Sequence, residues 1–189
     1  AASDVYKRQV TIAGGTIFTP DDGEEASYKA VAATSGTFAM GMNDAKTGSN
    51  GKDVVVQGTI SLGKKGTVDL GLGSSKSRWT GIADNKDGHP MNLYLSDGGM
   101  WENRRTSKDQ YGLFAGSRVT KVAGGTAPAK AGVIVQKDSN PITIDHYSGH
   151  TILFYDHEAS SPATMIGGDT IIANAEAGSG ITMRTNSRG

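Results

Sequence analysis

The chain has 189 residues, with 19 basic and 19 acidic side chains, a formal net charge of zero at pH 7 and no cysteine. This length suffices for one domain with a sizeable core, and the lack of cysteine excludes disulfides and thiolate metal sites. The basic residues form no stripe and few aromatic residues accompany them, so we expect no nucleic-acid partner.

The first nine residues, AASDVYKRQ, resemble the translation of a transposase adapter used to prepare sequencing libraries. A translated adapter is not native protein, so we interpret residues 1–9 as a scar and exclude them from the fold prediction. On this interpretation native sequence begins near Val10, and residues 10–189 are a fragment of a longer protein.

From Val10 onward, short strands alternate with turns. Within most of these segments apolar residues alternate with Thr, Ser, Asn or Asp, and Gly, Asn or Asp bound nearly all of them. The best helix candidate is DGEEASYKAVAA (22–33), in a region near 20–50 that we expect to be irregular or partly helical. The fold class is therefore all-β. We expect strands at 10–18, 53–62, 66–73, 91–96, 118–125, 132–136, 141–147, 150–156, 169–175 and 180–185.

Weak internal repeats indicate the architecture. Gly-Gly or Gly-Thr pairs precede several strands, and SRWTGIADN (77–85) and GGMWENRRT (98–106) each place a tryptophan before a polar turn. Repetition at roughly 20 to 30 residues is typical of solenoids, whose units stack on their neighbours. We predict a single-stranded parallel β-helix, right-handed by the general preference of parallel crossovers. A β-sandwich is the alternative, although hairpin turns of the Asn-Gly kind are scarce, with Asn50-Gly51 the main exception.

Three of the four histidines lie in ITIDHYSGHTILFYDH (142–157). Strand alternation places His146 on the face of Ile144 and puts His150 and His157 on different faces. Because imidazole ligands must converge on a metal ion, we predict no metal site and no cofactor. The histidines are expected to form hydrogen bonds where the backbone turns.

No catalytic residues are predicted. There is no nucleophile elbow of the G-x-S-x-G type, and the Gly-Gly pairs open strands rather than the helix that a phosphate loop needs. Paired carboxylates could cleave glycosides, but aspartate is also favoured at turns, where its side chain bonds to the backbone. The aspartates considered are Asp69, Asp84, Asp87 and Asp97.

Two tryptophans are the candidate ligand-binding residues. Trp79 and Trp101 could stack on a sugar ring as a binding patch. They could equally pack in the core of a coil, which we favour somewhat.

From about residue 53 to 187 the chain resembles the passenger region of bacterial autotransporters. The likeness is carried by VVVQGTISLGKKGTVDLGLGSSKSRWTG, MNLYLSDGGMWENR, ITIDHYSGHTILFYDHE and IGGDTIIANAEAGSGITMRTNS. In that family, alternating strands precede W-T-G or W-x-N turns, and later coils carry YSG-x-T and AGS-x-IT phrases. The resemblance implies a β-helical passenger at the bacterial cell surface, tethered to the outer membrane by its own C-terminal membrane barrel. It also implies host or neighbouring-cell surface glycans or proteins as partners.

Three functions are consistent with these observations. The leading hypothesis is a non-catalytic structural stalk and adhesin, whose long flanks present polar ladders to ligands. A polysaccharide lyase or hydrolase on the same fold would instead need acids and a base clustered on one flank. The third hypothesis, a phage fibre or tailspike segment, predicts trimerisation.

Overall fold

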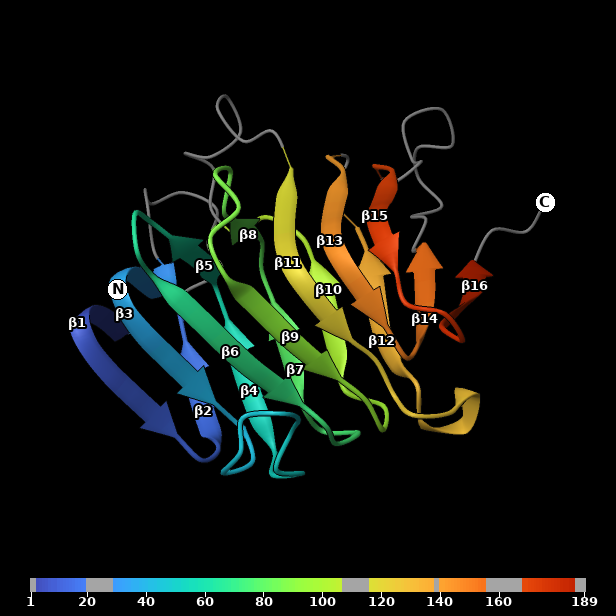
Figure 1. Ribbon diagram of the computed structural model, residues 1–189, viewed down its shortest axis with the longest axis horizontal. Coiled ribbons are helices and arrows are strands. Elements are labelled where there is room, and N and C mark those ends of the chain that lie inside the picture. Colours follow the sequence, from blue (N-terminus) through green and yellow to red (C-terminus); the bar gives the residue numbers. More distant parts are fainter. Residues whose placement is uncertain (1–2, 20–28, 107–115, 138–139, 156–167, 186–189) are drawn as a thin grey trace.

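The computed structural model describes residues 3–19, 29–106, 116–137, 140–155 and 168–185 (Figure 1). Within these ranges it is all-β, and its helical element is the short 3-10 helix Pro128–Lys130. The strands are β1 Ser3–Ile12, β2 Gly15–Phe18, β3 Lys29–Met40, β4 Val54–Gln57, β5 Thr59–Leu62, β6 Thr67–Leu72, β7 Arg78–Thr80, β8 Ala83–Asp84, β9 Met91–Leu95, β10 Met100–Asn103, β11 Ser117–Ala123, β12 Gly132–Gln136, β13 Ile142–Ser148, β14 His150–Tyr155, β15 Thr170–Ala175 and β16 Gly180–Thr185.

The strands form two sheets. Sheet A has the order β15-β13-β11-β9-β6-β3-β5-β8, with β1 also paired to β3, and sheet B has the order β16-β14-β12-β10-β7-β4-β2. From β9 onward successive strands alternate between the sheets, so each strand up to β14 pairs with strands one coil before and one coil after it. Figure 1 shows the chain advancing along its longest axis from β1 and β2 to β15 and β16.

All ladders between the described strands are parallel. Antiparallel contacts within the described ranges are isolated bridges, such as the one between Met42 and Ser49. A β-sandwich is built from antiparallel strands, so the arrangement is consistent with the predicted solenoid and not with the sandwich.

The core consists of apolar side chains that stack in register from coil to coil. In sheet B, one inward position is occupied in successive strands by residues that are at most 9% exposed. Burial of such a ladder stabilises the fold by roughly 25 cal/mol per Å² of apolar surface. Its members are Ile17, Val56, Trp79, Trp101, Ile134 and Leu153.

The helix expected in residues 22–33 is not observed where the structure describes them. Residues 29–33 belong to strand β3, which pairs with β1 on one side and with β5 and β6 on the other. Backbone pairing on both sides outweighs the helix propensity of the alanines, which is a weak preference. The rest of the helix candidate, residues 22–28, lies outside the described residues.

Strand β1 includes residues of the segment interpreted as an adapter scar. Its pairing with β3 shifts register between Val5 and Gln9 and is regular from Gln9 to Ile12. A strand can form whatever the origin of its residues, so the scar remains a prediction.

Candidate functional site

The two tryptophans lie in the core. Trp79 and Trp101 are both 0% exposed, and their rings stack with centroids 4.9 Å apart and planes 5° from parallel. Each indole Nε1 donates a hydrogen bond of 3.0 Å to a backbone carbonyl of the preceding coil, that of Gly58 for Trp79 and that of Gly81 for Trp101. A sugar cannot reach either ring in the folded chain. Of the two alternatives considered for Trp79 and Trp101, the burial fits core packing, which the sequence favoured somewhat over a ligand-stacking patch.

His146 faces outward, contrary to the alternation expected for its strand. Ile144 and Tyr147 are buried, whereas Asp145 is half-buried and His146 is exposed. Two consecutive residues thus point away from the core, and the same pattern occurs in β11 at Thr120 and Lys121. The prediction that His146 shares a face with Ile144 is wrong because strict period-two alternation fails at this point of the strand.

His150 lies on the outer side of β14. The residue after it, Thr151, is buried, as the alternation predicts. The His150 backbone exchanges two hydrogen bonds of 2.9 Å with Gly125, and a β-carbon added at Gly180 would come within 3.0 Å of its Nδ1. His157 lies outside the described residues. Within the described ranges no three His, Asp or Glu side chains are grouped as metal ligands.

The four aspartates considered for glycoside cleavage occupy different elements. Asp69 lies on β6 and accepts a hydrogen bond of 2.8 Å from Asn92 Nδ2. Asp84 lies on β8 and Asp87 in the turn that follows it. Asp97 adopts a left-handed turn conformation with φ of 52°. Turn geometry and ladder hydrogen bonding account for Asp97 and Asp69 without a catalytic role.

A row of polar side chains crosses the outer side of sheet A in register. It runs over five neighbouring strands, which in a β-sheet are roughly 4.8 Å apart. We call this row the polar ladder. It consists of Asp69, Asn92, Lys121, His146 and Asn174.

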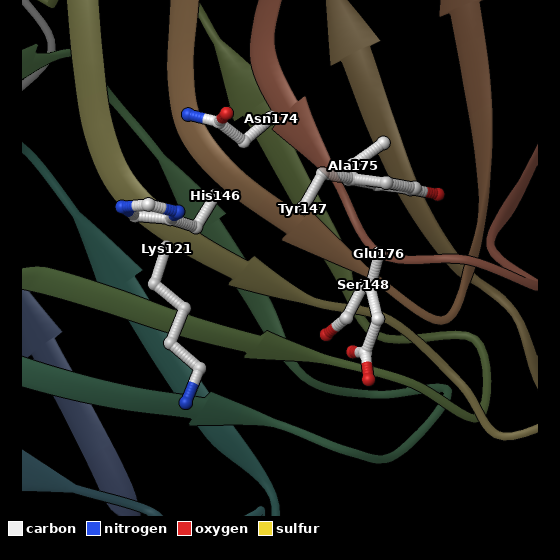
Figure 2. A pocket seen from close by; sticks show the side chains of 7 residues that line it. All are labelled: Lys121, His146, Tyr147, Ser148, Asn174, Ala175 and Glu176. Carbon is white, nitrogen blue, oxygen red and sulfur yellow. The ribbon is translucent and has the colours of Figure 1, made fainter.

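Beside the C-terminal half of the polar ladder lies a hollow of about 310 Å³, which we call the groove. Figure 2 shows the Lys121, His146 and Asn174 side chains on one side of it, and Ser148 beside Glu176 on the other. The groove is lined by Lys121, His146, Tyr147, Ser148, Asn174, Ala175 and Glu176.

Tyr147 borders the groove, but its side chain is buried. Its hydroxyl donates to the Gly180 carbonyl at 2.6 Å and lies 2.8 Å from Thr151 Oγ1. Burial raises the pKa of the Tyr147 phenol, and the hydrogen bonds with Thr151 offset part of this effect. Below this raised pKa the phenol is neutral, and beneath the groove its hydroxyl joins β13 to Thr151 and Gly180.

The charges near the groove are unevenly paired. Arg118 forms an ion pair of 3.1 Å with Asp145. Lys121 Nζ instead lies 3.4 Å from the Tyr94 hydroxyl and 5.1 Å from the centroid of that ring. Within the part of the chain that the structure describes, Lys121 forms no ion pair with a carboxylate.

The groove was not predicted from the sequence. The sequence nevertheless contains a pattern that indicates it. In each of three neighbouring coils a polar residue, Lys121, His146 or Asn174, comes directly before a residue that faces inward. Aligning RVTKVA, TIDHYS and IIANAE as successive coils superimposes the three positions.

Comparison of the chain with protein-family models, curated proteins and solved structures finds no match in any of the three. Among the described residues, no helix is long and apolar enough to cross a membrane.

Proposed function

We propose that the chain is part of a right-handed parallel β-helix that serves as the stalk and adhesive surface of a secreted, autotransporter-type passenger. The observation that carries this proposal is the uninterrupted parallel stacking of strands from β2 to β16, with a polar ladder on the outside. Stacked repeats of this kind produce long surfaces on which binding groups recur.

The function follows from the two sides of the stacked strands. Inward ladders such as the one through Trp79 and Trp101 stiffen the stalk, because each coil buries its neighbour's apolar side chains. Outward side chains are spaced by the strand separation and offer many weak contacts, which add together when a surface is engaged at several points. No bond is made or broken.

Location and partners follow from the resemblance of residues 53–187 to autotransporter passengers. The intact protein would be displayed at the bacterial surface and tethered by its own C-terminal membrane barrel. It would contact glycans or proteins on host or neighbouring cells.

The test is binding of the full chain to arrays of cell-surface glycans and extracellular matrix proteins, followed by analysis of the supernatant. We expect reversible binding that scales with surface density, without release of saccharide products. If the chain binds none of the array surfaces, the adhesive role is overturned. Release of new reducing ends or unsaturated sugars would support the polysaccharide-cleaving alternative, and a stable trimer in sedimentation equilibrium would support the fibre segment.

A further inference from the structure

The groove has the size of a site for one small ligand. Its volume of about 310 Å³ lies at the lower end of the range for small-molecule sites. Its outer side chains are the short one of Ser148 and the longer ones of His146, Asn174 and Glu176.

The lining suits a ligand rich in hydroxyl groups. Imidazole, amide, hydroxyl and carboxylate groups from His146, Asn174, Ser148 and Glu176 offer both donors and acceptors. Tyr147 points into the core, and Ala175, which pairs with it, faces the same way. A peptide added to the free edge of sheet A at β15 would depend on pockets for its alternate side chains, whereas this lining presents polar groups that can satisfy several hydroxyls at once.

The charged side chains at the two sides of the groove define how an acidic ligand is oriented in it. Lys121 lies at one side of the groove beside His146. Among the described residues it forms no ion pair with a carboxylate. Glu176 lies at the other side, next to Ser148 (Figure 2). A ligand carboxylate is attracted to Lys121 and repelled by Glu176, which leaves the ligand's hydroxyls toward Glu176, Ser148 and Asn174.

We infer that the groove binds an acidic saccharide unit, with its carboxylate at Lys121 and His146 and its ring hydroxyls at Asn174, Ser148 and Glu176. This inference rests on the proposed adhesive function, because it names the ligand class that one part of the outer surface recognises. Repeated weak capture of a uronate-bearing polymer gives avidity when many copies of the chain are displayed on one surface.

The experiment is an NMR titration of the ¹⁵N-labelled full chain with D-glucuronate and, separately, with uncharged D-glucose. We expect glucuronate to shift the amide signals of His146, Asn174 and Glu176, and glucose to bind more weakly. Lys121→Gln should raise the Kd for glucuronate about tenfold, since a charge-assisted hydrogen bond is lost. The matched control is Lys65→Gln, which alters an exposed lysine in the turn before β6 and should leave the Kd unchanged.

Two results would overturn the inference: equal affinity for glucose and glucuronate, or equal Kd values for the Lys121→Gln and Lys65→Gln variants. The array measurement separates this failure from failure of the proposed function. If the chain binds the array, and neither glucuronate nor the Lys121→Gln substitution weakens that binding, the groove is not the saccharide site but the adhesive function stands. Glucuronate binding in solution without binding to any array surface keeps the groove and removes the adhesin.

Discussion

The indole of Trp101 lies flat on the indole of Trp79, and each ring donates its N–H to the carbonyl of a residue in the preceding coil. The stacked rings and their hydrogen bonds therefore connect three successive coils, those that contain Gly58, Trp79 and Trp101. Offset stacking of aromatic rings contributes about 0.5–1.5 kcal/mol beyond area burial. The pair thus links neighbouring coils in sheet B.

Replacement of Trp101 tests this linkage. Trp101→Ala should lower the free energy of unfolding by about 3–5 kcal/mol, because a large cavity is left in the core. Trp101→Phe keeps a ring against Trp79 but leaves the Gly81 carbonyl without its donor, so a loss of about 1–3 kcal/mol is expected. Urea unfolding followed by circular dichroism measures both. Efficient quenching of the wild-type indole fluorescence by acrylamide would contradict the buried stack. So would an unchanged urea midpoint of unfolding for Trp101→Ala.

A second prediction concerns the close approach of coils at Gly58. Gly58 and Gly15 both have positive φ, 132° and 119°, but a β-carbon at Gly58 would collide with Thr19 Oγ1 and lie 3.0 Å from Ala30 Cβ. At Gly15 no atom lies within 4 Å of the added carbon. Gly58→Ala should therefore destabilise the chain by about 1–3 kcal/mol more than Gly15→Ala, through overpacking. Equal shifts in thermal midpoint would show that backbone conformation alone sets the cost.

A buried polar network where β10 and β12 end and β11 begins gives a third prediction. Asn103 Nδ2 donates to Gln136 Oε1 at 2.6 Å, and Ser117 Oγ donates to Asn103 Oδ1 at 2.7 Å. Asn103, Ser117 and Gln136 are at most 1% exposed. Removing one partner leaves a buried polar group unsatisfied, at a cost of about 1–3 kcal/mol.

A double-mutant cycle measures this network. Asn103→Ala and Gln136→Ala should be coupled by about 1 kcal/mol or more, so that the double variant loses less than the sum of the single variants. The control cycle uses Asp53→Ala and Ser74→Ala, whose hydrogen bond of 2.7 Å is exposed. Its coupling should be smaller, because water replaces the lost partner. Equal couplings would place the first pair in contact with solvent.

The sequence predicted strands best where alternation is regular. Residues 132–136 and 180–185 were expected as strands, and β12 and β16 have these bounds. The segments 10–18 and 53–62 were each expected as one strand but are divided into two, the second at Gly58. At Gly58 alternation continues across the corner, so the pattern of apolar residues does not reveal it.

Two features depended on contacts that a linear sequence does not show. The short strands β7 and β10 hold the tryptophans, and only the register of β10 on β7 reveals that the rings stack. Similarly, the outward turn of His146 depends on a local break in alternation shared by neighbouring strands. In a parallel sheet the partner of each residue lies a whole coil away, so local patterns leave both the register and the groove undetermined.

Alkaline pH should destabilise the chain through Tyr147. Burial raises the pKa of its phenol above the ordinary value of 10.0, so the folded state holds the proton more tightly than the unfolded state. The resulting stability is fully present below pH 10 and is lost as pH rises through the folded-state pKa. Thermal midpoints should therefore fall more steeply above pH 10 in the wild type than in Tyr147→Phe. Because all other titrating groups are shared, parallel curves for the two proteins would refute a raised Tyr147 pKa.

The last described coil leaves an apolar ladder uncovered. Met183 pairs with Leu153 and continues its inward ladder, yet Met183 is 62% exposed whereas Leu153 is 5% exposed. Ile181, which pairs with Thr151, is 39% exposed in the same strand. Strands β15 and β16 end the strand orders of their sheets, and an uncovered edge with apolar side chains favours pairing with another chain.

We therefore expect concentration-dependent self-association of the chain in sedimentation velocity, and a charge on the uncovered ladder should weaken it. Met183→Lys should raise the dissociation constant about tenfold or more, because association would bury an unpaired ammonium group. The matched control is Thr182→Lys, on the same strand but at the position paired with the outward residue Ile152. Equal weakening by both substitutions would place the contact on the outer face of β16, and a monomer at all concentrations would show that the open coil does not bind a second copy.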